Sequence, residues 1–228
     1  MYLLTETASP FALERWAAFF ANFGQFAKGF FYTLGISIGA LIVALLLGLI
    51  FGAMSSTHNK VLRVYVEIFQ NTPLLVQFVV VFYGISILTD GHVMIPISLT
   101  AILCVGVYTG AYISEIIRTG IEAVPKGQTE AALSQGFTYA DTMRIIILPQ
   151  AVRTILPPLT NQVVNLIKNT STVAIISGAD IMFTAKAWAY DTTNYVPAFA
   201  GAAFLYFIMC FPLATWARRK EEENKKAY

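Results

Sequence analysis

Charged residues are scarce in this sequence. Aspartate, glutamate, lysine and arginine make up 12% of its 228 residues, whereas hydrophobic residues make up 57%. Soluble domains carry about 25% charged residues, so the composition excludes that class and indicates an integral membrane protein. The formal net charge is only +2, and we expect no nucleic-acid partner.

The sequence contains few cysteines and histidines and no nucleotide-binding loop of the G-x-x-x-x-G-K-[ST] type. Cys104 and Cys210 lie in apolar runs without partners at metal-ligand spacing, so they are interpreted as small buried hydrophobic residues. The only histidines, His58 and His92, fall at opposite predicted membrane faces, which disfavours a membrane-embedded enzyme. No G-x-x-x-x-G-K-[ST] segment occurs, so we do not expect this chain to bind ATP in that manner.

Long apolar runs dominate the rest of the chain. A helix needs about 20 such residues to cross the hydrocarbon layer. Four runs of this length lack any charge, and a fifth is interrupted only by Lys168. We therefore predict an all-α integral membrane protein with five transmembrane helices. The five runs are 29–57, 68–89, 93–114, 154–179 and 192–217.

These runs predict three parts of the chain. Residues 1–25 form a segment outside the membrane or at its interface, 26–217 a transmembrane domain, and 218–228 a cytoplasmic tail. A cytoplasmic loop covers about 119–148. The aromatic residues of the first segment recur at helical spacing, which suits either an interfacial helix or an extension of the first span.

The basic residues are distributed unevenly between the two predicted faces. If successive segments between the spans are assigned alternately to the two faces, eleven of the 15 lysines and arginines lie on one face and only Arg15, Lys28 and Lys186 on the other. The remaining one, Lys168, lies within a span. Because basic residues concentrate in cytoplasmic loops, the amino terminus is predicted to lie outside and the carboxyl terminus in the cytoplasm.

A polar stretch between two spans predicts a cytoplasmic helical hairpin over 125–149. Gly136 is placed to end a first helix in a left-handed cap. Thr138 and Asp141 then fit the cap of a second helix, and Pro149 suits the first turn of the next span.

The hairpin contains the pattern E-A-A, three residues, G, nine residues, I-x-L-P. It resembles the EAA loop of importer-type ABC transporter permeases. The resemblance implies a coupling helix that sits in a groove on the cytoplasmic ATPase and passes motion to the transmembrane helices. A plain connecting hairpin is the alternative. The coupling residues implied are Glu130, Ala131, Ala132 and Gly136.

Three further segments are similar to the polar amino acid permeases, which include histidine, glutamine, glutamate and arginine systems. They are "VEIFQNTPLLVQ", "GAYISEIIRTGIEAVPKGQTEAA" and "LPQAVRTILPPLTNQVVNLIKNTS". With the span plan, the resemblance covers about 26–216. Gln70 departs from it, because many members carry an arginine there.

The resemblance implies a type I ABC importer permease in a bacterial cell membrane. Its implied partners are a cytoplasmic ATPase dimer, a second permease subunit that is identical or homologous, and an extracytoplasmic amino-acid-binding protein. ATP and Mg²⁺ would be bound by the ATPase, and no cofactor by this chain.

Polar residues in two predicted spans are candidates for a substrate pathway, because polar groups are costly inside a membrane. Asn161, Asn165, Lys168 and Thr172 are spaced to share one helix face. Asn71 and Thr72 precede the kink-prone Pro73. The alternatives are that Lys168 snorkels or is neutralised by a neighbouring helix, and that the amides join helix to helix.

The lysine could receive an amino acid's carboxylate, and no aspartate or glutamate lies deep within the predicted spans. A neutral or acidic substrate such as glutamine or glutamate is therefore expected, unless a second permease supplies a carboxylate. The alternative function is an ion-gradient-driven secondary carrier, which would normally contain more spans in repeated halves and deep acidic residues.

Overall fold

The computed structural model describes residues 9–55 and 60–226, and all regular elements in these ranges are helical. The start of the predicted 1–25 segment, His58 and the last two residues of the tail lie outside the described residues. The helices are α1 (Leu13–Ala21), α2 (Phe23–Ser55), α3 (Lys60–Asn71), α4 (Leu74–Val79), the π-helix η1 (Val80–Gly84), α5 (Ile85–Leu88), α6 (Ile97–Glu122), α7 (Lys126–Ser134), α8 (Tyr139–Asp141), the π-helix η2 (Thr142–Ile147), α9 (Leu148–Asn169), the 3-10 helix η3 (Thr170–Ile176), α10 (Ile181–Thr192) and α11 (Tyr195–Lys226).

Three helices are long and apolar enough to cross a membrane. They are Phe23–Gly52 in α2, α6, and Tyr195–Lys220 in α11. The bent pair Arg63–Asn71 and Leu74–Leu88 would make a fourth. The fourth predicted span corresponds to α9 and η3, which are not among the spans identified by length and apolarity among the described residues. The five-span count therefore stays a prediction.

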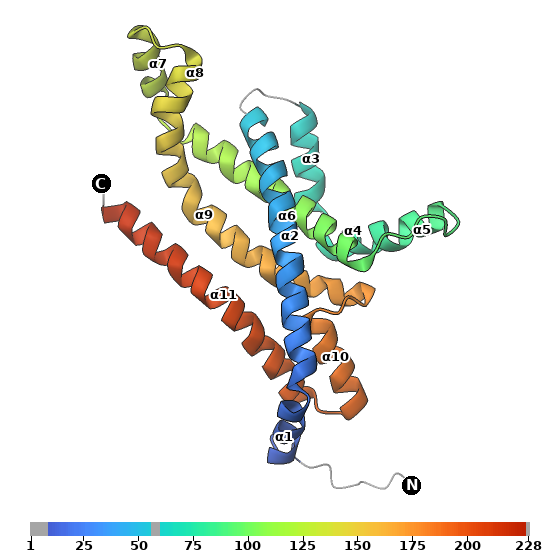
Figure 1. Ribbon diagram of the computed structural model, residues 1–228. Helices are drawn as coiled ribbons and strands as arrows, with labels where there is room; N and C mark the ends of the chain where they lie inside the picture. The colour runs from blue at the N-terminus through green and yellow to red at the C-terminus, as the bar shows by residue number, and fades with distance from the viewer. Residues whose placement is uncertain (1–8, 56–59, 227–228) are drawn as a thin grey trace, which may run out of the picture.

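Close contact between α2 and α6 forms the centre of the molecule (Figure 1). A Cβ atom added to Gly106 would lie 2.7 Å from Cβ of Val43, and one added to Gly48 would lie 2.3 Å from a methyl group of Ile113. Glycine at these positions lets the two helices approach closely. By contrast, nothing lies within 4 Å of a Cβ atom added to Gly35 of α2.

The second predicted span is not one straight helix. It bends by 100° between α3 and α4, where Pro73 caps α4 and the ladder of backbone hydrogen bonds is interrupted. The arm formed by α4, η1 and α5 therefore extends sideways from the bundle (Figure 1). The prediction of a span over 68–89 holds only as a broken span.

A second cluster forms where α1, α2, α10 and α11 meet. Phe19 of α1 packs edge-on against Phe26 and Trp188, and a Cβ atom on Gly201 of α11 would lie 2.3 Å from its ring. Arg15 of α1 donates to the carbonyl oxygen of Thr193, 2.9 Å away. Trp16, Phe19 and Phe20 therefore belong to a separate helix tied to the α10–α11 turn, whereas Phe23 begins α2.

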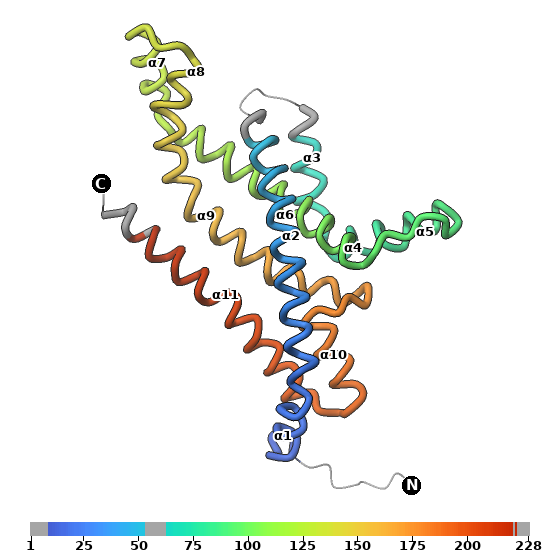
Figure 2. The backbone as a smooth tube through the Cα atoms, viewed as in Figure 1, coloured from blue at the N-terminus to red at the C-terminus, as the bar shows by residue number. Residues whose placement is uncertain are grey.

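Different helices form the two ends of the molecule. The hairpin of α7 and α8 projects at one end, and α1 and α10 lie at the other (Figure 2). α9 runs between them, packed against both α6 and α11. This arrangement connects the predicted coupling segment to the predicted pathway through one helix.

Candidate coupling hairpin and translocation face

The hairpin forms as its sequence predicts. Gly136 has φ +86° and follows α7, and its N–H donates to the carbonyl oxygen of Leu133 at 3.0 Å. The N–H of Phe137 donates to the carbonyl oxygen of Ala132 at 3.2 Å, which completes a Schellman cap. A left-handed φ favours glycine, so Gly136 sets the direction in which the chain leaves α7.

The return of the hairpin is capped by Thr138. Its hydroxyl oxygen accepts from the N–H of Asp141 at 3.2 Å, and the Thr138 hydroxyl donates to the Asp141 carboxylate at 2.5 Å. The chain then continues through the π-helix η2 into α9, with Pro149 in the first turn of α9. The two predicted caps of the hairpin are thus confirmed.

The predicted coupling residues divide between two environments. Ala132 is buried and α7 packs on η2, whereas Glu130 and Ala131 are exposed. Large apolar side chains also remain exposed on the hairpin, with Tyr139 at 61% and Leu133 at 46%. This surface has the chemistry of a docking site: apolar groups for contact and a carboxylate for orientation.

The fourth predicted span presents its polar row on an open side. Asn161, Asn165 and Lys168 are exposed, and Thr172 in η3 is half-buried. The other side of α9 is buried against α6 and α11, and includes Leu166. The residues share a face as the spacing predicts, and that face is not filled by the described residues of this chain.

The break in the second span is stabilised by Gln77. Its Nε2 donates to the carbonyl oxygens of Phe69 at 3.2 Å and Thr72 at 3.0 Å. These carbonyls lack helical partners because α3 ends here, so Gln77 satisfies groups that would be costly in a membrane. The side chain of Asn71 donates back to its own helix, to the carbonyl oxygen of Glu67 at 2.8 Å.

The break lies near the end of the polar row, because α4 packs against η3. Thr72 is half-buried and Asn71 exposed at this junction. Gln70, the position that departs from the resemblance, donates its Nε2–H to the carbonyl oxygen of Ala111 on α6 at 3.2 Å. The two candidate groups of pathway residues are therefore brought toward each other by the fold.

One buried carboxylate was missed by the sequence reasoning. Asp180, which lies between the fourth and fifth predicted spans, is 0% exposed and caps α10. Asp180 directly follows the fourth predicted span, so the expectation that no aspartate or glutamate lies within the spans is unchanged, but a buried acidic residue lies next to one of them. Asp180 faces the interior of the chain, while Lys168 is exposed on α9, and no ion pair joins them. A carboxylate within two residues of a helix start is the signal that could have predicted the cap.

Residues 44–221 match the family described as "Binding-protein-dependent transport system inner membrane component". The chain belongs to this family. It is therefore the inner membrane permease component of an ABC transporter, and ATP hydrolysis belongs to a separate subunit. Membership decides against an ion-gradient-driven secondary carrier.

The sequence resemblance to polar amino acid permeases is confirmed by individual relatives. Probable glutamine ABC transporter permease protein GlnM of Bacillus subtilis is 37% identical over 216 residues, which are 92% of this chain and 97% of that protein. Glutamate/aspartate import permease protein GltJ of Escherichia coli is 33% identical over 208 residues, which are 82% and 85% of the two chains.

Solved structures share the fold. The chain of an amino acid ABC transporter crystallised with histidines has a TM-score of 0.83 and 31% identity, with 91% of this chain and 98% of that chain covered. A chain of the inward-facing MetNI methionine ABC transporter has a TM-score of 0.70 at 15% identity, with 88% and 98% covered. The second comparison bears on the fold alone.

Proposed function

We propose that this permease forms the translocation pathway of an ATP-driven importer for a neutral or acidic polar amino acid, such as glutamine or glutamate. The observation that carries this proposal is the open face of α9, where Asn161, Asn165 and Lys168 are exposed and no carboxylate of the described part of the chain accompanies them. An ammonium and two amides suit the carboxylate and the polar side chain of such a substrate. The similarity to GlnM, a probable glutamine permease, and to GltJ, a glutamate/aspartate permease, supports the same substrates.

The open face also supports a second permease subunit, identical or homologous. Polar groups in a membrane face protein or a water-filled cavity, so the α9 row would be expensive against lipid. A partner subunit across this face would enclose the row, together with Asn71, Thr72 and Thr172, in a central cavity. The uneven distribution of basic residues supports an orientation with the amino terminus outside and the hairpin in the cytoplasm.

Coupling to the ATPase is assigned to the hairpin. Exposed Glu130 and Ala131 would contact a groove of the ATPase, while buried Ala132 lies where α7 packs on η2 and the left-handed cap at Gly136 sets the direction in which the chain leaves α7. Because η2 continues directly into α9, a shift of α7 would move the helix that carries the pathway residues. The family implies an ATPase and a binding protein as partners.

The test is uptake by the complete transporter in proteoliposomes. The complex should accumulate glutamine or glutamate when ATP and its binding protein are supplied, and continue when ion gradients are collapsed. Arginine and lysine should be transported at least tenfold more slowly, because no carboxylate on the open face offsets their cationic side chains. Preferential uptake of arginine would contradict the proposed substrate class.

A further inference from the structure

Asp180 stands at the point where the pathway segment turns back into the bundle. η3 ends at Ile176, Ser177 takes a left-handed φ of +61°, and α10 starts directly after Asp180. Gly178 is tightly enclosed, since an added Cβ would lie 2.1 Å from a methyl group of Val173. The helix that this turn begins, α10, lies in the half of the molecule away from the coupling hairpin (Figure 1).

The carboxylate joins α10 to α11. Its oxygens accept from the backbone N–H of Met182 at 2.9 Å and of Phe183 at 3.4 Å. The hydroxyl of Tyr206 on α11 donates to the same carboxylate at 3.4 Å. The carboxylate is thus both a helix cap and a contact between two helices that are distant in sequence.

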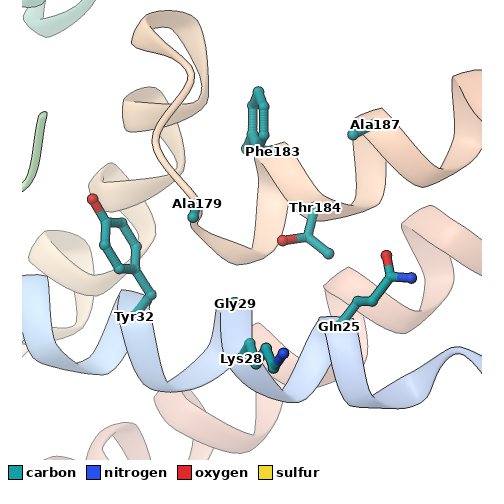
Figure 3. Close-up of a pocket in the computed structure, with 8 residues that line it drawn as sticks. All are labelled: Gln25, Lys28, Gly29, Tyr32, Ala179, Phe183, Thr184 and Ala187. Atoms are coloured by element: carbon teal, nitrogen blue, oxygen red, sulfur yellow. The ribbon is translucent and has the colours of Figure 1, made fainter.

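The same turn is tied to α2. The hydroxyl oxygen of Thr33 accepts from the N–H of Ile181 at 3.1 Å, and Thr184 donates to the carbonyl oxygen of Asp180 at 2.9 Å. Gly29 permits the approach, because an added Cβ would lie 2.9 Å from the Thr184 hydroxyl. Figure 3 shows Thr184 and Ala179 on one side and Gly29 and Tyr32 on the other. The groove that these residues line has a volume of about 370 Å³.

No cationic side chain among the described residues forms an ion pair with the Asp180 carboxylate. The titratable groups of the described chain that face it are Tyr32 of α2 and Tyr206 of α11. η3 has no ionisable side chain, and Lys186 on α10 is exposed. Burial raises the pKa of the Asp180 carboxyl from 3.8 to about 6, against the opposing effect of its hydrogen bonds.

At neutral pH the Asp180 carboxylate is charged in buried surroundings that favour its protonated form. A buried acid whose pKa is raised stabilises its closed surroundings when it is protonated, at low pH, and that stabilisation is lost as pH rises through about 6. Hydration stabilises the charged form of the Asp180 carboxylate. At pH 7.5 the carboxylate therefore favours any conformation that hydrates it, while its hydrogen bonds favour the closed one.

We infer that Asp180 is a positioning residue for transport, whose carboxylate holds the start of α10 against α11 and becomes hydrated when that end of the permease opens. The inference rests on the proposed function as an importer permease. A neutral side chain that keeps the cap, as asparagine does, should then hold this end closed more firmly than aspartate.

The test compares Asp180→Asn with the parent and with Asp191→Asn, which neutralises an exposed carboxylate on the same helix. In the complete transporter at pH 7.5, Asp180→Asn should assemble normally and lower the uptake rate at least fivefold. The upper limit is about 100-fold, because each pKa unit corresponds to tenfold. Parent uptake should fall as external pH drops through about 6, whereas that of Asp180→Asn should stay flat.

A second readout does not depend on the substrate. Ala185 is 0% exposed on α10, so a cysteine there should be reached by an impermeant maleimide only when this end opens. In a background lacking Cys104 and Cys210, labelling at pH 7.5 with ATP and binding protein should be at least fivefold slower with Asp180→Asn.

Equal labelling and equal uptake by Asp180→Asn and the parent would overturn the inference and leave Asp180 as a helix cap. If the parent takes up no amino acid but its labelling depends on residue 180, the proposed substrate class fails while the inference stands. Asp191→Asn should match the parent in both measurements, and an equal loss there would also count against the inference.

Discussion

At the scale of single residues, two charges distinguish this permease from an apolar helical bundle. Lys168 is exposed on the open face of α9, whereas Asp180 is fully enclosed by α2, α10 and α11. The lysine was predicted because it interrupts an apolar run. The aspartate was not, because burial of a residue between helices depends on how those helices pack.

We predict that Lys168→Met removes uptake without preventing insertion. A cationic side chain costs about 2.5 to 3.5 kcal/mol at the centre of a membrane helix on insertion scales, and Lys168 lies in the last turn of α9, so its loss should not weaken insertion. If the substrate carboxylate binds this ammonium, uptake should fall at least tenfold while assembly and ATP binding persist. Radiolabelled uptake and co-purification of the ATPase measure the two effects.

Lys168→Arg is the matched control, because it keeps the charge but replaces a compact ammonium with a planar guanidinium. It should retain part of the activity. Near-normal uptake by Lys168→Met would remove this residue from the pathway. Loss of assembly would reassign it to an ion pair with another subunit.

At the scale of elements, the hairpin and the α2–α6 contact each depend on a glycine, for different reasons. Gly136 supplies a left-handed φ that other residues adopt only with strain, whereas Gly106 supplies space for a neighbouring helix. The first determines the direction of α7 and the second determines how closely two spans pack. Substitutions should therefore affect coupling in one case and stability in the other.

Gly136→Val should uncouple the transporter. A β-branched residue at φ +86° is strained by about 1–2 kcal/mol or more, so α7 should lose its present cap. We expect uptake per ATP hydrolysed to fall at least fivefold, with the chain still inserted. Gly127→Ala is the control, since this glycine has no positive φ and nothing within 4 Å of its added Cβ. Normal coupling in Gly136→Val would make the hairpin a plain connector.

Gly106→Val should destabilise the permease, because its side chain would overlap Val43 and approach the carbonyl oxygen of Ala40. Overpacking of this kind costs about 1–3 kcal/mol. Gly35→Val has the same chemistry in open space and should leave the melting temperature nearly unchanged. Thermal unfolding of the detergent-purified chain measures the difference, and equal melting temperatures would show that α2 and α6 tolerate wider spacing.

At the scale of the whole molecule, the hairpin and the α10–α11 turn lie at opposite ends (Figure 2). We predict that they are on opposite sides of the membrane, with the hairpin in the cytoplasm. Cysteines replacing Thr129 and Asn194, in a background lacking Cys104 and Cys210, should then react with an impermeant thiol reagent from opposite sides. Labelling of both from outside would exclude the predicted topology.

The sequence by itself determined the membrane class, the hairpin and the polar face of α9. These features rest on local chemistry: apolar run length, a glycine and a threonine at cap positions, and spacing by three or four residues. Each depends on residues close together in the chain, and the EAA pattern added the family.

Only the tertiary structure decided how the remaining polar residues are used. Pro73 indicated a kink, but a 100° bend stabilised by Gln77 depends on the packing of α4 against η3. Asp180 lies between two predicted spans in the sequence, and it is buried because α2 and α11 pack around it. Burial and long-range hydrogen bonds depend on which helices meet, and the apolar periodicity of helices that face lipid on one side does not specify their neighbours.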